Sequence, residues 1–383
     1  MLAQIGDAKR RLEWRADEIE AARSLPSDIV AELRAIGIYR MLVPRSHGGL
    51  EFDQRELGAV IAALSAVEGA IGWMALIGTA GAAALGQLPK TVFDEIYRDG
   101  PDVIAAGSGV PSGKAEIVSG GYRVSGRWPF ASGCHHAAWM FGSCAVLRDG
   151  LPATGADGNP APPRMVFLPA RDWRIEDTWM AEGLKGTGSH HIALTDAFVP
   201  EANTIDPGAM QPAVPTVMYR SGFRLFPTHH AAFAIGLAER AIDDFVALAT
   251  TGKLPAVGRT PVRESPIVQY DLGRAEAELR AAQALLATQC DLDCAHAAEG
   301  RANDLDHFVR RLQSAIWIGE ACLRSIDSCY RLGGGSSVYE TSPLQRRMRD
   351  MRAASQHVWA HLRHYAPAGA LRLGLPAVHP ANW

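Results

Sequence analysis

Hydrophobic residues recur every three or four positions along the first hundred residues of the chain. Two such stripes are Leu25, Ile29, Leu33 and Ile36, followed by Leu57, Val60, Ile61 and Leu64. This spacing places apolar side chains on one face of an α-helix. Pro26 stands where it suits the first turn of one of these helices. Residues 1–100 are therefore predicted to form an N-terminal helical domain.

The pattern changes after residue 101 to short β-branched and aromatic runs separated by Gly and Pro. The runs 115–118 and 122–125 are joined by Ser119, Gly120 and Gly121, a combination that predicts a β-hairpin. Further strands are predicted at 139–147, 165–168 and 190–199, with a Gly-, Pro- and Asp-rich loop at 148–163. Residues 101–212 are predicted to form a central antiparallel β-domain.

Helical periodicity returns after Pro215. Two apolar stripes run through Phe233, Leu237, Ala241, Phe245 and Leu248, and through Leu272, Ala275, Leu279, Ala282 and Leu286. A third helix is predicted from Asp304 to Leu332, ended by Gly333–Gly335, and a fourth follows Pro343. Residues 213–383 are therefore predicted to form a four-helix bundle, which makes the fold class α+β.

Composition and charge favour a globular protein that acts on small molecules. The 383 residues are 48% hydrophobic and carry a formal net charge of -3, without a basic patch for nucleic acid or lipid headgroups. Six cysteines lack zinc-type spacing or the density of a disulfide scaffold, and no signal peptide pattern opens the chain, so a cytoplasmic location is expected. The uncharged stretch 69–89 is rich in Gly and Ala, which favours a buried core helix over a membrane span.

Several motifs spread along the chain carry a resemblance to a known family. They are Tyr39–Pro44 with Gly48–Gly49, Gly121–Trp128 continuing into Phe130–Gly133, His136 and Trp139, Gly183–Ser189 with Val199–Glu201, and Arg349–Asp350 with Gln356–His357. Together they resemble the acyl-CoA dehydrogenase superfamily, and most closely its two-component flavin-dependent monooxygenase branch, typified by hydroxylases of 4-hydroxyphenylacetate and of a steroid-derived phenol. The resemblance implies a central β-barrel, flavin between barrel and bundle, and a homotetramer.

The sequence departs from the dehydrogenase pattern where that chemistry needs a carboxylate base. A dehydrogenase removes an α-proton of an acyl thioester while hydride leaves for the flavin. The two positions at which the family places the base correspond to Val358 and Phe226, which cannot accept a proton. Glu201, Glu239 and Glu340 remain alternative bases.

Two residues are predicted to be catalytic. Ser132 matches the Ser or Thr that approaches flavin N5 in the superfamily, although a hydroxyl that satisfies its own turn would look the same. His357 matches the histidine beside the flavin in the hydroxylases, a role suited to a group that titrates near neutral pH, although without the resemblance it reads as a surface histidine.

The remaining candidate residues follow from the same resemblance. Cofactor contacts are expected from Trp128, Phe130, Ser132, Gly133, Gly109, Ser112, Arg259 and Gln269, and substrate contacts from His136, Trp139 and Trp179. The aromatic residues would equally well form plain core, the Gly109 segment a plain turn, and His136 a turn cap. Because Thr260–Pro261 replaces the expected aromatic–glycine pair beside Arg259, the choice between FMN and FAD stays open.

Other chemistries find less support in the sequence. His357, His361 and His364 share a helical face, and His190–His191 and His229–His230 are adjacent, but no H-E-x-x-H pattern accompanies them, so no metal site is predicted. No G-x-S-x-G elbow for a serine hydrolase follows a strand.

The function expected is that of an oxygenase component that uses reduced FMN or FAD and O2 to hydroxylate a small phenolic or indolic compound through a C4a-hydroperoxyflavin. A separate NAD(P)H-dependent reductase would supply the flavin, since no nicotinamide fingerprint is present. The alternatives are an FAD-dependent acyl-CoA dehydrogenase and a non-catalytic scaffold of the same fold.

Overall fold

A computed structural model describes residues 1–155, 158–255, 259–301 and 304–376. The N-terminal helices are α1 (Leu2–Glu13), α2 (Ala16–Ala22), α3 (Ser27–Ile36), α4 (Gln54–Val67), α5 (Gly69–Leu85) and α6 (Lys90–Ile96). The strands are β1 (Ala105–Val118), β2 (Gly121–Ala131), β3 (Trp139–Arg148), β4 (Leu151–Pro152), β5 (Arg164–Pro169), β6 (Arg174–Glu176), β7 (His190–Pro200) and β8 (Thr204–Ile205). The C-terminal helices are α7 (Phe226–Thr250), α8 (Pro266–Ala298), α9 (Leu305–Leu332), α10 (Pro343–Ala354) and α11 (Tyr365–Arg372).

Local sequence signals account for where several helices begin and end. Asp53 caps α4 in a capping box. The Asp53 carboxylate accepts from the Glu56 backbone N–H, and the Glu56 carboxylate accepts from the Asp53 backbone N–H. Asp304 caps α9 as the sequence predicts, and Gly334, with φ +58°, takes the left-handed conformation just beyond the end of that helix. The predicted extent of the third C-terminal helix, about Asp304 to Leu332, and the predicted start of the fourth at Pro343 are therefore confirmed.

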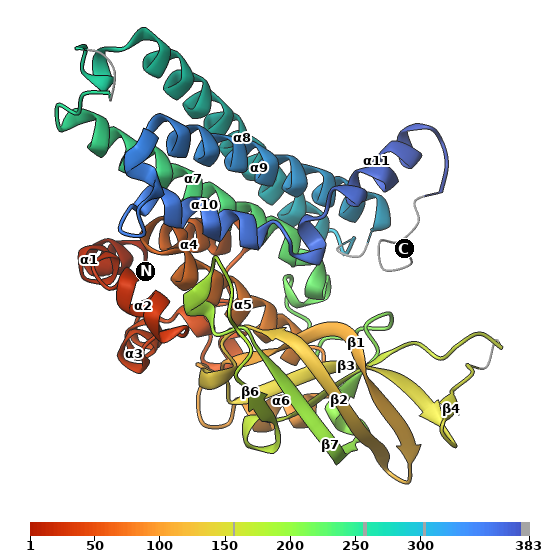
Figure 1. Cartoon of the computed structure of the whole chain (residues 1–383). Helices are drawn as coiled ribbons and strands as arrows, with labels where there is room; N and C mark the ends of the chain where they lie inside the picture. Colours follow the sequence, from red (N-terminus) through yellow and green to blue (C-terminus); the bar gives the residue numbers. More distant parts are fainter. Residues whose placement is uncertain (156–157, 256–258, 302–303, 377–383) are drawn as a thin grey trace.

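Three layers stack in the molecule, as Figure 1 shows: helices α7–α10 form one layer, α4 and α5 lie between, and the sheet lies on the far side. The charge-free stretch forms α5, in which nearly every residue is buried, so it is the core helix that the sequence favours. No helix in the described ranges is both long and apolar enough to cross a membrane. One continuous apolar core joins the N-terminal and C-terminal helices, and a second fills the sheet region.

The sheet is mixed rather than antiparallel, which corrects the prediction. Its strand order is β6-β7-β2-β1-β3-β5-β8, with β4 beside β3, and no pairing among the described residues closes it into a barrel. The predicted hairpin is present as β1 and β2, with Ala115 opposite Val124. However, β3 pairs in parallel with the other edge of β1, because β7 occupies the free edge of β2 and the segment 132–138 carries the chain back to the start of β1.

The division at residues 100 and 212 stays a prediction, although the last N-terminal helix ends at Ile96 and the long bundle helices begin at Phe226. Residues 377–383 of the predicted C-terminal domain, and residues 156–157 of the predicted loop, lie outside the described ranges.

Trp128 fills the centre of the sheet region. Its side chain has no exposed surface, its Nε1 donates to the Ser143 carbonyl at 2.6 Å, and its ring meets Trp173 edge-on at 5.2 Å. Glycines on neighbouring positions make room for it: a Cβ on Gly142 would lie 2.6 Å from the indole, and one on Gly113 2.1 Å. The indole therefore belongs to the core, the alternative that the sequence left open.

We expect Gly142→Ala to lower the free energy of unfolding by about 1–3 kcal/mol, because the added methyl group would force Trp128 out of its packing. The matched control is Gly273→Ala on the exposed side of α8, where a Cβ meets nothing within 4 Å. That control should raise stability by about 0.5–1 kcal/mol through helix propensity. Equal effects of the two substitutions in chemical denaturation would contradict the close packing described above.

Candidate active site

Ser132 follows a break in the pairing of β2. The register between β2 and β7 shifts between Trp128 and Ala131, and Phe130 adopts a left-handed φ of +65°, which is uncommon for a bulky residue. The Ser132 backbone N–H then donates to the Phe130 carbonyl at 2.9 Å. Backbone strain of this kind persists only where the surroundings enforce it and gathers at functional sites.

The Ser132 hydroxyl belongs to a buried chain of hydrogen bonds. Trp73 Nε1 donates to Ser132 Oγ at 3.1 Å, Ser132 Oγ lies 2.7 Å from Ser189 Oγ, and Ser189 Oγ lies 2.6 Å from Thr187 Oγ1. Thr187 Oγ1 in turn donates to the Leu184 carbonyl at 2.8 Å.

The direction of this chain follows from counting protons, because each hydroxyl has only one to donate. Since Thr187 donates to Leu184, it must accept from Ser189, and Ser189 must then accept from Ser132. Ser132 thus gives its proton to Ser189 and accepts one from Trp73, and no other side chain among the described residues donates to the second acceptor position on its Oγ.

His357 lies on the other side of Trp73. Its ring stacks on Phe226 at 4.4 Å between centroids and meets Trp73 edge-on at 5.9 Å. Nδ1 accepts from the Trp359 backbone N–H at 3.3 Å, so in the neutral ring the proton resides on Nε2. Burial, and then the neighbouring His230, lower the pKa of His357 to about 3. The expectation that His357 titrates near neutral pH is therefore wrong: it is a neutral imidazole with an N–H to donate.

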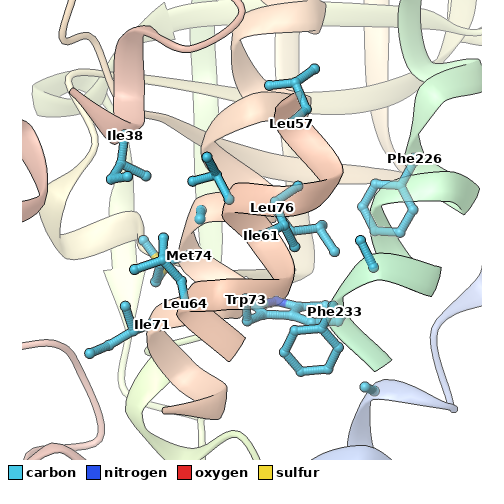
Figure 2. Close-up of a cluster of buried hydrophobic side chains, with 14 of the residues drawn as sticks. Ile38, Leu57, Ile61, Leu64, Ile71, Trp73, Met74, Leu76, Phe226 and Phe233 are labelled. Atoms are coloured by element: carbon cyan, nitrogen blue, oxygen red, sulfur yellow. The ribbon is translucent and has the colours of Figure 1, made fainter. Parts of the chain in front are cut away.

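His230 completes the aromatic cluster and holds His357 in place. The carbonyl of Ala354 accepts two hydrogen bonds at 3.1 Å, one from His230 Nε2 and one from the His357 backbone N–H. His230 is buried, and burial lowers its pKa to about 4. In Figure 2 the indole of Trp73 lies against Phe233, with Phe226 further along α7.

The sequence predicts Ser132 and His357 as site residues but misses Trp73, which contacts both, and His230, which packs beside His357. Trp73 sits in a stretch of apolar residues, where helical periodicity cannot distinguish an indole that packs from one that donates a hydrogen bond. His230 was considered only as a metal ligand beside His229. In the described part of the chain, no three His, Cys, Asp or Glu side chains gather as metal ligands would.

Some predicted cofactor residues lie near Ser132 and others lie elsewhere. Gly133, with φ +75°, donates its N–H to the Thr187 carbonyl at 2.8 Å, and Phe130 is 62% exposed with its ring 6.5 Å from that of Trp179. Gly109 and Ser112 lie on an exposed bulge of β1, where five steps along β1 oppose two along β3.

Arg259 and Gln269 lie around the connection between α7 and α8, and both are exposed. Figure 1 shows this connection at the end of the helical layer away from the sheet. The Gln269 amide donates to the Arg263 carbonyl at 3.1 Å. No hydrogen bond within the described part of the chain joins either residue to Ser132, which follows β2 in the sheet region.

The predicted substrate residues are spread around the edges of the site. His136 Nε2 lies 3.2 Å from Ser24 Oγ, so its ring faces the segment between α2 and α3. Trp179 is half-buried and donates from Nε1 to the Leu184 carbonyl at 3.0 Å, which ties it to the turn that holds Ser132. Trp139 is half-buried at the start of β3 and packs against the helical core.

The alternative carboxylate bases are engaged away from Ser132 and His357. Glu239 accepts from the Gln283 amide, Glu201 lies 3.7 Å from the Arg164 guanidinium, and Glu340 is exposed beyond α9. The position that matches one dehydrogenase base is Val358, which is half exposed, and the other is Phe226, which stacks on His357.

Comparison with known proteins identifies the family of this chain. Family models for the N-terminal and C-terminal domains of acyl-CoA dehydrogenase match residues 7–88 and 228–361. The indole-3-acetate monooxygenase of Acinetobacter baumannii is 30% identical over 94% of this chain and 90% of its own length. The chain belongs to the flavin-dependent monooxygenase branch of the acyl-CoA dehydrogenase family.

Two further relatives agree with this assignment. The oxygenase component of the FADH(2)-dependent resorcinol hydroxylase of a Rhizobium species is 31% identical over 90% of this chain and 86% of its own length. The crystal structure of the 3-HSA hydroxylase from Rhodococcus sp. RHA1 superposes with a TM-score of 0.89 at 25% identity, covering 99% of this chain and 98% of that one.

We expect the unfolding free energy of His230→Gln to fall less steeply at acid pH than that of the wild-type monooxygenase. Because the pKa of His230 is depressed in the folded state, the unfolded chain binds more protons below pH 6.5, and stability falls as the pH drops from 6.5 towards about 4. Removing this group should reduce the slope of unfolding free energy against pH by about 1.2 kcal/mol per pH unit between pH 5 and 6. An unchanged slope in denaturation series would mean that His230 is not held neutral by the fold.

Proposed function

We propose that the chain is the oxygenase component of a two-component flavin-dependent monooxygenase that hydroxylates a small aromatic compound, phenolic or indolic. Its relatives are named for oxygenation of aromatic compounds, including indole-3-acetate and resorcinol. The observation that carries the proposal is the convergence of Ser132 and His357 on Trp73, without a carboxylate at either position that a dehydrogenase base would occupy.

The residues around Ser132 fit a reduced flavin. Such a flavin, when bound, supplies the two electrons with which O2 is activated, so that one oxygen atom enters the substrate and the other leaves as water. The unused acceptor position on Ser132 Oγ suits the N–H that a reduced flavin carries at N5. The buried aromatic cluster of Trp73, Phe226 and Phe233 keeps water away from that position.

His357 is proposed to orient the substrate through its Nε2–H. Because the ring is neutral, it can donate this proton to a phenolic oxygen without carrying a charge into an apolar pocket. His136, Trp139 and Trp179 would line the outer part of the substrate site, and Gly109, Ser112, Phe130 and Gly133 would contact the cofactor.

Further parts of the proposal concern assembly. Arg259 and Gln269 would hold the phosphates of a cofactor bound in a neighbouring subunit of a homotetramer, since both are exposed at the far end of the bundle. Either FMN or FAD would serve, and a separate NAD(P)H-dependent reductase would deliver it in the cytoplasm.

The first test is anaerobic mixing of the purified protein with reduced FMN or FAD, followed by addition of O2 and a panel of phenols and indoles. We expect hydroxylated product in proportion to flavin oxidised, with hydrogen peroxide falling as product rises. Tight binding of oxidised FAD that acyl-CoA bleaches would instead identify a dehydrogenase. Failure to bind flavin in either redox state would favour the third alternative, a non-catalytic scaffold of the same fold.

Ser132→Ala should increase the release of hydrogen peroxide per flavin oxidised by about tenfold, because the loss of a positioned acceptor weakens control of the reacting cofactor. The matched control is Ser65→Ala in α4, a buried serine whose hydroxyl donates only to the Ile61 carbonyl of its own helix. Peroxide release that rises equally in both variants, measured with a peroxidase-coupled assay, would remove Ser132 from the site.

A further inference from the structure

Asp350 lies where three segments of backbone meet. This residue of α10 is 2% exposed, and its Oδ1 accepts from the Leu184 backbone N–H at 2.6 Å. A Cβ on Gly69, the first residue of α5, would lie 2.4 Å from Asp350 Oδ2, and one on Gly183 would lie 2.1 Å from the Arg349 carbonyl oxygen. The three segments are therefore in direct contact around one carboxylate.

Each of these segments also carries residues that contact Ser132 or His357, directly or through the hydroxyl chain. Trp73 lies one helical turn after Gly69, and the segment that starts at Leu184 supplies Thr187 and Ser189. The third segment, α10, ends at Ala354, the residue whose carbonyl accepts from His357 and His230. Asp350 thus stands at the common base of the groups that contact Ser132 and His357.

Leu184 needs an external partner because its own conformation is unfavourable. It adopts φ +51°, the left-handed region that a leucine rarely occupies. Its carbonyl is the acceptor at which the hydroxyl chain from Ser132 ends, and it also accepts from Trp179 Nε1. The bond from the Leu184 N–H to Asp350 holds this residue in the conformation that aims its carbonyl at Thr187.

The surroundings of Asp350 make its negative charge unfavourable. Glu68 lies 3.1 Å and Asp244 3.4 Å from the Arg347 guanidinium. Asp244 also pairs with Arg240 at 2.7 Å, and Glu20 on α2 pairs with Arg349 at 3.0 Å. Burial, and then the neighbouring Glu68, raise the pKa of Asp350. The Leu184 N–H donates to a side-chain oxygen of Asp350, and an asparagine amide would present an oxygen acceptor of similar size at the same place.

We propose that Asp350 is a positioning residue of the oxygenation reaction, which fixes the Leu184 turn and, through Thr187 and Ser189, the direction in which the Ser132 hydroxyl points. This inference rests on the proposed function for its catalytic readout. Asp350 does not itself touch the reacting groups.

The test compares Asp350→Leu, which removes the acceptor but fills the space, with Asp350→Asn, which keeps the acceptor. In the protein without flavin, hydrogen exchange at the amides of Leu184 and Gly133 should quicken by about tenfold in the leucine variant and stay at the wild-type rate in the asparagine variant. With reduced flavin, O2 and substrate, peroxide release per flavin should rise in the leucine variant alone.

The matched control is Asp244→Asn, which removes a carboxylate from the same charge cluster but has no contact with Leu184. It is expected to change stability without changing exchange at Leu184 or peroxide release. Wild-type exchange and peroxide release in Asp350→Leu, or equal defects in Asp350→Asn, would overturn the inference.

If Asp350→Leu does not fold, Thr187→Val interrupts the same connection one step later and should raise peroxide release; an unchanged value would also overturn the inference. A wild-type protein that forms no product would refute the proposed function, whereas the exchange experiment would still decide whether Asp350 orders the turn.

Discussion

The close packing of α5 is the constraint on which the rest of the structure depends. This helix lies between the bundle and the sheet, and its glycines let both neighbours approach its backbone: a Cβ on Gly69 would collide with the Asp350 carboxylate of α10, and one on Gly81 with the Ala105 carbonyl of β1. Because the layers are so near, one side chain of α5 can contact both of them. Trp73 is that side chain, and its indole joins the sheet at Ser132 to the bundle at Phe233.

The sequence predicts the elements well because each carries a local signal. Asp304 and Pro343 mark helix starts, and Ser119–Gly120 marks the hairpin. The parallel pairing of β3 with β1 has no such signal, because alternation tells which face of a strand is buried but not which neighbour takes its edge. The strand pattern predicts an antiparallel sheet and the family resemblance implies a barrel, whereas the sheet of the described residues is mixed and has no pairing that closes it.

The residues of the candidate site likewise fall into those that a sequence motif marks and those that only the structure reveals. Ser132 and His357 are 225 positions apart, and only resemblance to a family could pair them before the fold was known. Trp128 matches a family motif as well as Ser132 does, yet it lies in the core, because a motif records position along the chain and not exposure. Trp73 and His230 carry no motif, and their roles follow only from the hydrogen bonds that they make.

The fixed donor direction along the hydroxyl chain has a consequence for which redox form of the flavin binds more tightly. Because the Ser132 hydroxyl already gives its proton to Ser189, in a chain that ends at the Leu184 carbonyl, it can only accept from any further partner. Under the proposed function, an oxidised flavin would present a lone pair at N5 to the lone pair of Ser132, whereas a reduced flavin would present a hydrogen. The site would thus bind the reduced form more tightly and release the oxidised form. An oxygenase that receives each flavin from a separate reductase requires this difference in affinity, because the spent cofactor must leave before the next turnover begins.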